Sequence, residues 1–197
     1  EVTANHNLSL LSIGVLTAFW AAINGAKALI LGINIAYGNP PSKGFFRPYL
    51  IAALATVGIP LIVVVTLVFQ VAGETIAQFL ENYFHQIEFV ITLIKRLGTV
   101  IPIVTTGIYF LLFYRLAPNV EVRFRDVIFG TVFATTAWFG ASYLFSIYIN
   151  QFANYSRFYG SIGSVIMLLF WLYITSMIIL LGAEINAAMA GRENRRK

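Results

Sequence analysis

Cysteine is absent from this chain, and its absence excludes disulfides, thiolate metal sites and cysteine nucleophiles. Charge is scarce as well, because Asp, Glu, Lys and Arg together make up only 11% of the 197 residues, and only two residues are histidine. Soluble domains carry about 25% charged residues, so this composition excludes an ordinary soluble globular protein.

Long apolar runs take the place of the missing charge. Five segments reach or approach the roughly 20 apolar residues that cross a bilayer core, and they cover residues 8–37, 48–73, 97–114, 127–149 and 161–187. Because backbone polar groups find no water inside lipid, such segments fold as α-helices. The sequence therefore predicts an all-α fold, a polytopic transmembrane helix bundle that forms a single domain over residues 1–197.

The last two segments carry small and hydroxyl-bearing residues at helical spacing. At about 100° per residue, one face of the last segment collects Ser164, Leu168, Trp171, Thr175, Ile178, Gly182 and Asn186. Small residues let membrane helices approach closely, and hydroxyl groups let them hydrogen-bond. We expect a central position for the last helix, and the predicted helix-packing residues are Gly130, Ala134, Ala137, Ala141, Ser164, Thr175 and Gly182.

Residues 74–92 differ from the apolar segments, because polar residues recur there at steps of four and three, namely Glu74, Gln78, Glu81, His85 and Glu88. Apolar residues fill the other side, so the pattern predicts one amphipathic interfacial helix. Glu81, His85 and Glu88 have a spacing that suits a metal site, but one histidine with two carboxylates makes a weak one. We therefore expect a solvated face, with no metal and no cofactor.

Lysine and arginine are distributed unequally among the loops. Nine of them lie in residues 38–48, residues 115–126 and the C-terminal tail, against three in the alternate loops. Loops rich in Lys and Arg stay in the cytoplasm. The C-terminus is therefore predicted to be cytoplasmic, and the segment 74–92 and residues 1–7 to lie outside.

Several stretches resemble one protein family. They are Phe19-Trp20 through Gly25-Ala26-Lys27-Ala28-Leu29, Ala36-Tyr37-Gly38 followed by Gly44-Phe45-Phe46-Arg47, and Gly182-Ala183-Glu184-Ile185-Asn186-Ala187. Over essentially its whole length the chain is similar to the YihY/BrkB inner-membrane family, historically mislabelled as ribonuclease BN. The resemblance implies a bacterial cytoplasmic-membrane protein that starts inside and is linked with envelope integrity and virulence. One N-terminal span is therefore expected to be missing before Glu1. The first residues of the given chain show no signal-peptide pattern.

The inventory of side chains argues against an enzyme. A metal-dependent nuclease clusters carboxylates and histidines around the scissile phosphate, whereas His6 and His85 are both predicted to lie outside. No phosphate-binding glycine motif and no serine nucleophile elbow appears. The net charge of +5 follows from the basic loops, so nucleic acid is not an expected partner.

Two functions remain open. Glycine and proline interruptions in the spans, together with polar residues at membrane depth, favour a transporter, flippase or channel-like protein. The resemblance points to envelope lipids or amphiphiles as its substrates. The alternative is a non-transporting scaffold or assembly protein of the envelope. Membrane lipids are expected partners in both cases, with a second copy of the chain or another envelope protein as further candidates.

Asn24, Lys27 and Glu184 are the candidate site residues, and no residue is predicted to be catalytic. Lys27 lies past the middle of the first span and Glu184 near the cytoplasmic end of the last. An unpaired charge in lipid is costly, and a pair or a water-filled pocket removes that cost. We expect the three residues to border one inward-opening polar cavity for an anionic headgroup. The alternative is that Lys27 reaches cytoplasmic water alone and that Glu184 pairs with arginines of the loops or tail.

Overall fold

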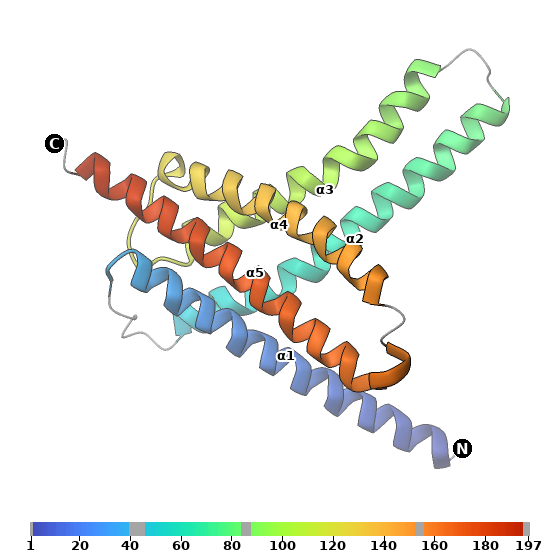
Figure 1. Ribbon diagram of the computed structural model, residues 1–197, viewed down its shortest axis with the longest axis horizontal. Helices are drawn as coiled ribbons and strands as arrows, with labels where there is room; N and C mark the ends of the chain where they lie inside the picture. Colours follow the sequence, from blue (N-terminus) through green and yellow to red (C-terminus); the bar gives the residue numbers. More distant parts are fainter. Residues whose placement is uncertain (1, 40–45, 84–87, 153–155, 195–197) are drawn as a thin grey trace. The chain divides into compact units, whose positions relative to one another are not determined.

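The computed structural model describes residues 2–39, 46–83, 88–152 and 156–194, and all regular structure within these ranges is α-helical. The helices are α1 (Val2–Ala36), α2 (Phe46–Tyr83), α3 (Glu88–Leu116), α4 (Phe124–Phe152) and α5 (Ser156–Asn194) (Figure 1). The stretches long and apolar enough to cross a membrane are Leu11–Ala36, Phe46–Leu80, Phe89–Leu116, Phe124–Asn150 and Gly163–Gly191. The all-α fold class, with five long apolar helices, is confirmed.

The polar stripe of residues 74–92 differs from the expectation of a separate helix. Residues 74–83 continue α2 and residues 88–92 begin α3, while residues 84–87 lie outside the described part. A polar stripe has the same period in the last turns of a long helix as in a separate short helix, so the sequence pattern does not distinguish the two. The only breaker nearby is Gly73, which costs a helix about 1 kcal/mol. The interfacial position of this segment stays a prediction.

By its packing the chain divides into two compact units, with boundaries inside α1 and α3. Unit 1 comprises residues 1–30 and 42–109, and unit 2 comprises residues 31–41 and 110–197. Each unit is described by itself below. The single membrane domain stays a prediction.

Unit 1 contains an antiparallel pair formed by α2 and the first part of α3 (Figure 1). A Cβ atom on Gly58 would lie 3.0 Å from the Tyr109 ring, and one on Gly73 would lie 3.6 Å from Ile94. Residues later in α2 thus contact residues earlier in α3, so the two helices are antiparallel. The Tyr109 hydroxyl donates a hydrogen bond of 3.2 Å to the carbonyl of Ala55, so its polar atom is satisfied between the helices.

Unit 2 is built on the antiparallel pair of α4 and α5, which lie side by side (Figure 1). Aromatic rings fill the space between them: the ring centroids of Phe145 and Trp171 are 4.9 Å apart, and those of Trp138 and Trp171 are 6.1 Å apart. Stacked aromatic pairs contribute about 0.5–1.5 kcal/mol beyond the area they bury. The end of unit 2 opposite to these rings carries the polar contacts described in the next subsection.

The C-terminal end of α1 belongs to unit 2 and closes with a glycine cap. The amide of Asn39 donates to the carbonyl of Asn34 at 3.0 Å, and the amide of Gly38 donates to that of Ile35 at 2.9 Å. This pair of bonds is the Schellman motif, which needs a left-handed residue after the helix. Gly38 takes that conformation, with φ of 68°, and thereby ends the helix before the loop.

We predict that Gly38→Ala lowers the stability of the folded protein by about 1 kcal/mol or more, because a Cβ atom is disfavoured in the left-handed region. The measurement is the thermal unfolding midpoint of the purified protein in detergent. Gly191→Ala is the matched control, since Gly191 lies in α5 with no atom near its missing Cβ. That control should be neutral or stabilising, and an equal loss in both variants would contradict the cap.

Candidate functional site

Asn34 holds the loop between α3 and α4. Its side chain is only 2% exposed. The amide nitrogen Nδ2 donates to the carbonyl of Ala117 at 3.1 Å, and the oxygen Oδ1 accepts from the backbone amide of Asn119 at 2.7 Å. One buried side chain thus satisfies two backbone groups that no helix pairs. The loop that starts at Ala117 is fixed to the end of α1.

Tyr114 joins α3 to α5. This fully buried tyrosine donates a hydrogen bond of 2.8 Å to the carbonyl of Ile179. A Cβ atom on Gly182 would collide with the Tyr114 hydroxyl, and it would stand 3.0 Å from the carbonyl oxygen of Gly130. A residue without a side chain is therefore required where the three helices meet.

Asn186 joins α5 to α4 at the same place. It is fully buried, and its Oδ1 accepts a 2.6 Å hydrogen bond from the backbone amide of Gly130. A Cβ atom on Gly130 would collide with the carbonyl of Gly182 and approach Asn186 to 2.5 Å. The two backbones therefore touch, and a polar bond crosses between them where lipid would offer none.

Several buried polar atoms of unit 2 have no hydrogen-bond partner within the described part of the chain. In the α4/α5 pair they are Thr135 Oγ1, Thr175 Oγ1 and Asn186 Nδ2, and at the ends of α1 and α3 they are Tyr37 Oη and Arg115 Nη1. Unpaired buried polar atoms are rare in native proteins, and an ordered water is a common partner for them.

Tyr37 lies just after the first membrane-spanning stretch. Burial raises the pKa of its hydroxyl to about 12, and the negative charge of Asp126 contributes in the same direction. Both effects disfavour a phenolate. The Tyr37 hydroxyl therefore stays protonated at neutral pH and is available as a hydrogen-bond donor.

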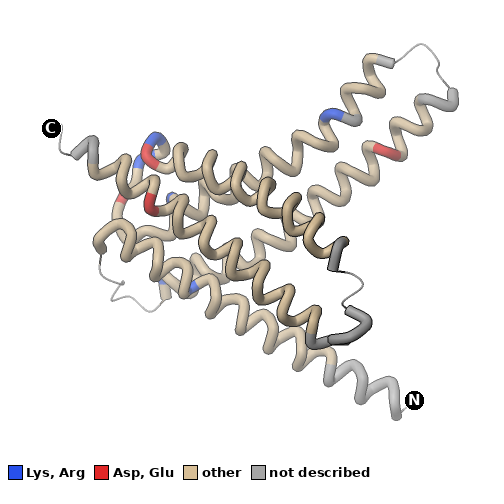
Figure 2. The backbone as a smooth tube through the Cα atoms, in the orientation of Figure 1, with Lys and Arg blue, Asp and Glu red and all other residues tan. Residues whose placement is uncertain are grey.

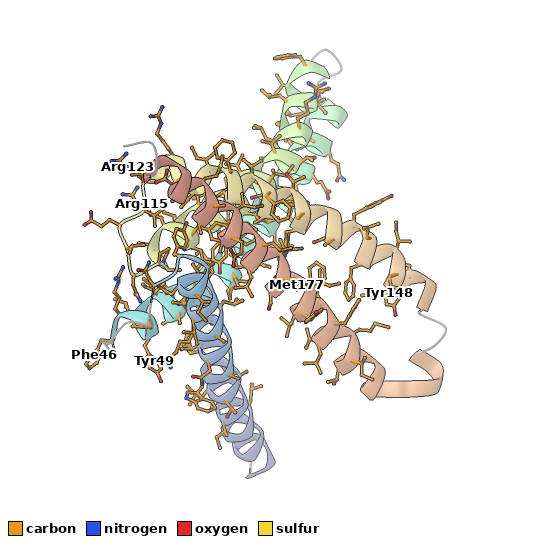
Figure 3. All side chains as sticks on the ribbon, turned by 60° about the vertical axis from the view of Figure 1, so that its left-hand side comes forward. Phe46, Tyr49, Arg115, Arg123, Tyr148 and Met177 are labelled. Carbon is orange, nitrogen blue, oxygen red and sulfur yellow. The ribbon has the colours of Figure 1, made fainter. Side chains whose placement is uncertain are left out.

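A groove of about 260 Å³ runs along the α4/α5 pair. Its lining consists of Ser142, Phe145, Ser146, Ile149 and Asn150 of α4 and Trp171 of α5. Tyr148, labelled in Figure 3, stacks on Phe145 beside it, with 6.3 Å between the ring centroids. The groove thus presents a row of polar groups next to aromatic surface.

Arg115 and the start of α4 form the basic end of unit 2. The guanidinium carbon of Arg115 lies 3.4 Å from the ring centroid of Phe124, the first residue of α4. Figure 2 shows the described charged residues of unit 2 gathered at this end, and Figure 3 places Arg115 and Arg123 there together. A guanidinium stacked on an aromatic ring is held in place by the attraction between the cation and the ring.

The three predicted cavity residues belong to two different units. In unit 1, Asn24 donates to the carbonyl of Trp20 at 3.0 Å, and the Lys27 ammonium lies 3.4 Å from the ring centroid of Tyr49. Glu184 belongs to unit 2, where its side chain is exposed on α5. Their shared cavity stays a prediction.

The predicted packing residues fall into two groups. Gly130, Ala134 and Gly182 are buried in unit 2. Ala137, Ala141 and Thr175 are half-buried, and Ser164 is exposed. The side chains of the metal-spaced residues Glu81, His85 and Glu88 lie outside the described part. Within the described residues, no group of three or more His, Cys, Asp or Glu side chains is arranged to hold a metal ion.

The sequence interpretation missed what Asn34, Tyr114 and Arg115 do. Asn34 was visible as a polar residue inside an apolar segment, which indicates a buried hydrogen bond. No sequence signal indicated the contacts of Tyr114 and Arg115, because an aromatic and a basic residue at the end of a span are ordinary interfacial anchors.

Five long apolar helices and polar contacts between buried backbones define a class, the multi-pass α-helical membrane proteins. The chain matches the family described as "Virulence factor BrkB" over residues 1–197, and it belongs to that family. The resemblance found in the sequence is confirmed.

Three bacterial relatives illustrate the family. The chain is 34% identical over 189 residues to YfkH of Bacillus subtilis, which is named a ribonuclease-like protein, and the match covers 96% of this chain and 69% of YfkH. It is 29% identical over 180 residues to a UPF0761 membrane protein of Idiomarina loihiensis, with coverage of 90% and 61%. A UPF0761 membrane protein of Vibrio vulnificus is 31% identical over 109 residues, with coverage of 55% and 35%.

These comparisons make the chain a multi-pass bacterial membrane protein. It spans less than two thirds of the length of the Idiomarina and Vibrio relatives. The UPF0761 names state a membrane protein and no enzyme activity. No solved structure matches the chain.

We predict that Gly130→Ala lowers stability by about 2 kcal/mol or more, because the new methyl group overpacks the contact and breaks the hydrogen bond that the Gly130 amide donates to Asn186. The unfolding midpoint in detergent is the measurement. Gly140→Ala on the same helix is the control, since no atom lies within 4 Å of its missing Cβ. Equal midpoints for the two variants would disprove the backbone contact between α4 and α5.

Proposed function

We propose that this chain is part of an inner-membrane transporter or flippase-like protein that handles envelope lipids or other amphiphiles. The observation that supports it best is the groove along α4 and α5, which combines polar and aromatic lining in a membrane-spanning region. A surface that only faces acyl chains has no use for such polar groups.

The polar groups in the groove form a row along the axis of α4. Ser142, Ser146 and Asn150 follow one another at intervals of four residues along one face of α4. Eight residues of helix span about 12 Å, so the row reaches from the end of the span well into the apolar region. It offers a path to a polar headgroup while Phe145 and Trp171 contact the acyl chains.

A scaffold or assembly protein is the second candidate. The direct contact between the backbones of Gly130 and Gly182 favours it, because such an interface resists the sliding that transport needs. The two functions differ in one measurable property, the movement of a lipid between leaflets.

We predict that the protein, reconstituted in lipid vesicles, moves a fluorescent phospholipid between leaflets, and that Ser146→Leu reduces the rate by about tenfold, a loss equivalent to about 1.4 kcal/mol. The measurement is the fraction of fluorophore reached by an impermeant quencher over time. Thr136→Leu is the control, since Thr136 is exposed on α4 away from the groove lining. Wild-type vesicles no faster than empty ones would exclude lipid transport and favour the scaffold.

We also propose that the C-terminus is cytoplasmic, from the excess of basic residues in residues 38–48, residues 115–126 and the C-terminal tail. Because the chain has no cysteine, single cysteines can report its topology directly. We predict that Lys43→Cys, Arg125→Cys and Arg196→Cys resist an impermeant thiol reagent in intact cells, while His85→Cys reacts. Reaction of Arg125→Cys from outside would reverse the orientation.

A further inference from the structure

One face of α4 carries uncharged polar residues over nearly the whole length of its span. They are Thr131, Thr135, Ser142, Ser146 and Asn150, at intervals of four, seven, four and four residues. Such intervals place side chains on one face of a helix. The helix rises about 29 Å from the first to the last of them, close to the thickness of a bilayer core of about 30 Å. The last three line the groove beside Trp171, and Thr131 and Thr135 are buried.

The groove is far from the described charges of unit 2, and none of its lining residues is charged. Along α4 the charged residue nearest to Ser142 is Asp126, about 24 Å away, and along α5 Glu184 lies about 20 Å from Trp171. Figure 2 shows the described charges of unit 2 at the other end of the helix pair. An ionised headgroup in the groove would have no counter-charge among these residues, and such a charge is costly in a membrane-spanning region.

The polar groups of the groove include both donors and acceptors. The Ser142 hydroxyl donates to the carbonyl of Trp138 at 2.7 Å, so its oxygen is left to the groove as an acceptor. The amide of Asn150 donates and accepts, and the indole N–H of Trp171 donates. An ionised phosphate only accepts, so it gives Ser142 no donor, whereas a hydroxyl group both donates and accepts. The lining therefore matches a headgroup made of hydroxyl groups.

The size of the groove suits one small headgroup. Its volume of about 260 Å³ equals the share of about nine waters in the liquid, which is room for a glycerol or a single sugar. The rings of Phe145 and Trp171 stack with 4.9 Å between their centroids, so the apolar wall of the groove is fixed by its own contacts. A wall formed in advance reduces the entropy that is lost when a ligand binds.

We propose that the groove takes the headgroup of an uncharged, hydroxyl-rich amphiphile, a glycolipid with a single sugar, in preference to an anionic phospholipid. This assignment rests on the lipid-handling function proposed above and narrows its substrate class. A phospholipid is then a slower substrate, because its phosphate enters a groove that has no counter-charge and leaves the Ser142 acceptor without a donor.

The experiment compares monoglucosyldiacylglycerol with phosphatidylglycerol, both with the same acyl chains and the same fluorophore on one chain. Each is incorporated into vesicles that contain the reconstituted protein, and access of an impermeant quencher gives the rate of movement between leaflets above that of empty vesicles. The glucosyl lipid should move about tenfold faster or more. Ser142→Ala should lower this rate ratio by about fivefold, because the sugar loses one hydrogen bond. Ser176→Ala is the matched control, since Ser176 makes the same kind of bond within α5 outside the groove lining, and it should leave the ratio unchanged.

The ratio is measured in one preparation, so a variant that folds only in part lowers both rates by the same factor. Asn150→Leu, at an exposed position of the groove, is the second variant and should also lower the ratio. Movement of neither lipid would overturn the transport function itself. Movement of both lipids with phosphatidylglycerol equally fast or faster, or an unchanged ratio in both groove variants, would overturn the headgroup assignment and leave transport intact. Arg157→Gln, which removes the charge nearest to Asn150 in the sequence, should keep the preference, and its loss there would place the selectivity outside the groove.

Discussion

The bond between Asn186 and the backbone amide of Gly130 is the contact on which the rest of unit 2 depends. In lipid no water competes for these atoms, so a polar bond between helices holds them in one register. Gly130 and Gly182 make the bond geometrically accessible, because a Cβ atom at either position would collide with the facing helix. With the register fixed here, the antiparallel direction brings Trp171 onto Trp138 and Phe145 further along the pair.

The arginines at the basic end of unit 2 have different surroundings. Basic residues beside a span orient it in the membrane, and any exposed lysine or arginine does this equally well. Arg115 is different, because it is half-buried and its guanidinium carbon lies 3.4 Å from the ring centroid of Phe124.

The polar groove and the basic end lie at opposite ends of α4. From Phe124 to Ser142 the helix rises about 27 Å, close to the thickness of a bilayer core of about 30 Å. The two features therefore lie about one bilayer core apart along α4. A lipid-moving protein needs both ends open to its substrate, whereas a scaffold needs lipid only as an anchor. Membership of the family fixes the membrane class and leaves this choice to transport measurements.

The sequence by itself determined the features that depend on local chemistry. Apolar length predicted five long helices, because the cost of unpaired backbone groups in lipid permits little else, and the quoted stretches around Lys27, Tyr37 and Glu184 identified the family. Gly130 and Gly182 contact each other, while the packing role of the small residues in the last two segments as a set stays a prediction. Only the tertiary structure decided that residues 74–83 continue α2, that Asn34 holds a loop more than 80 residues away, and that Arg115 stacks on Phe124. These outcomes depend on contacts between distant segments, and side-chain periodicity carries no information about which distant segments meet.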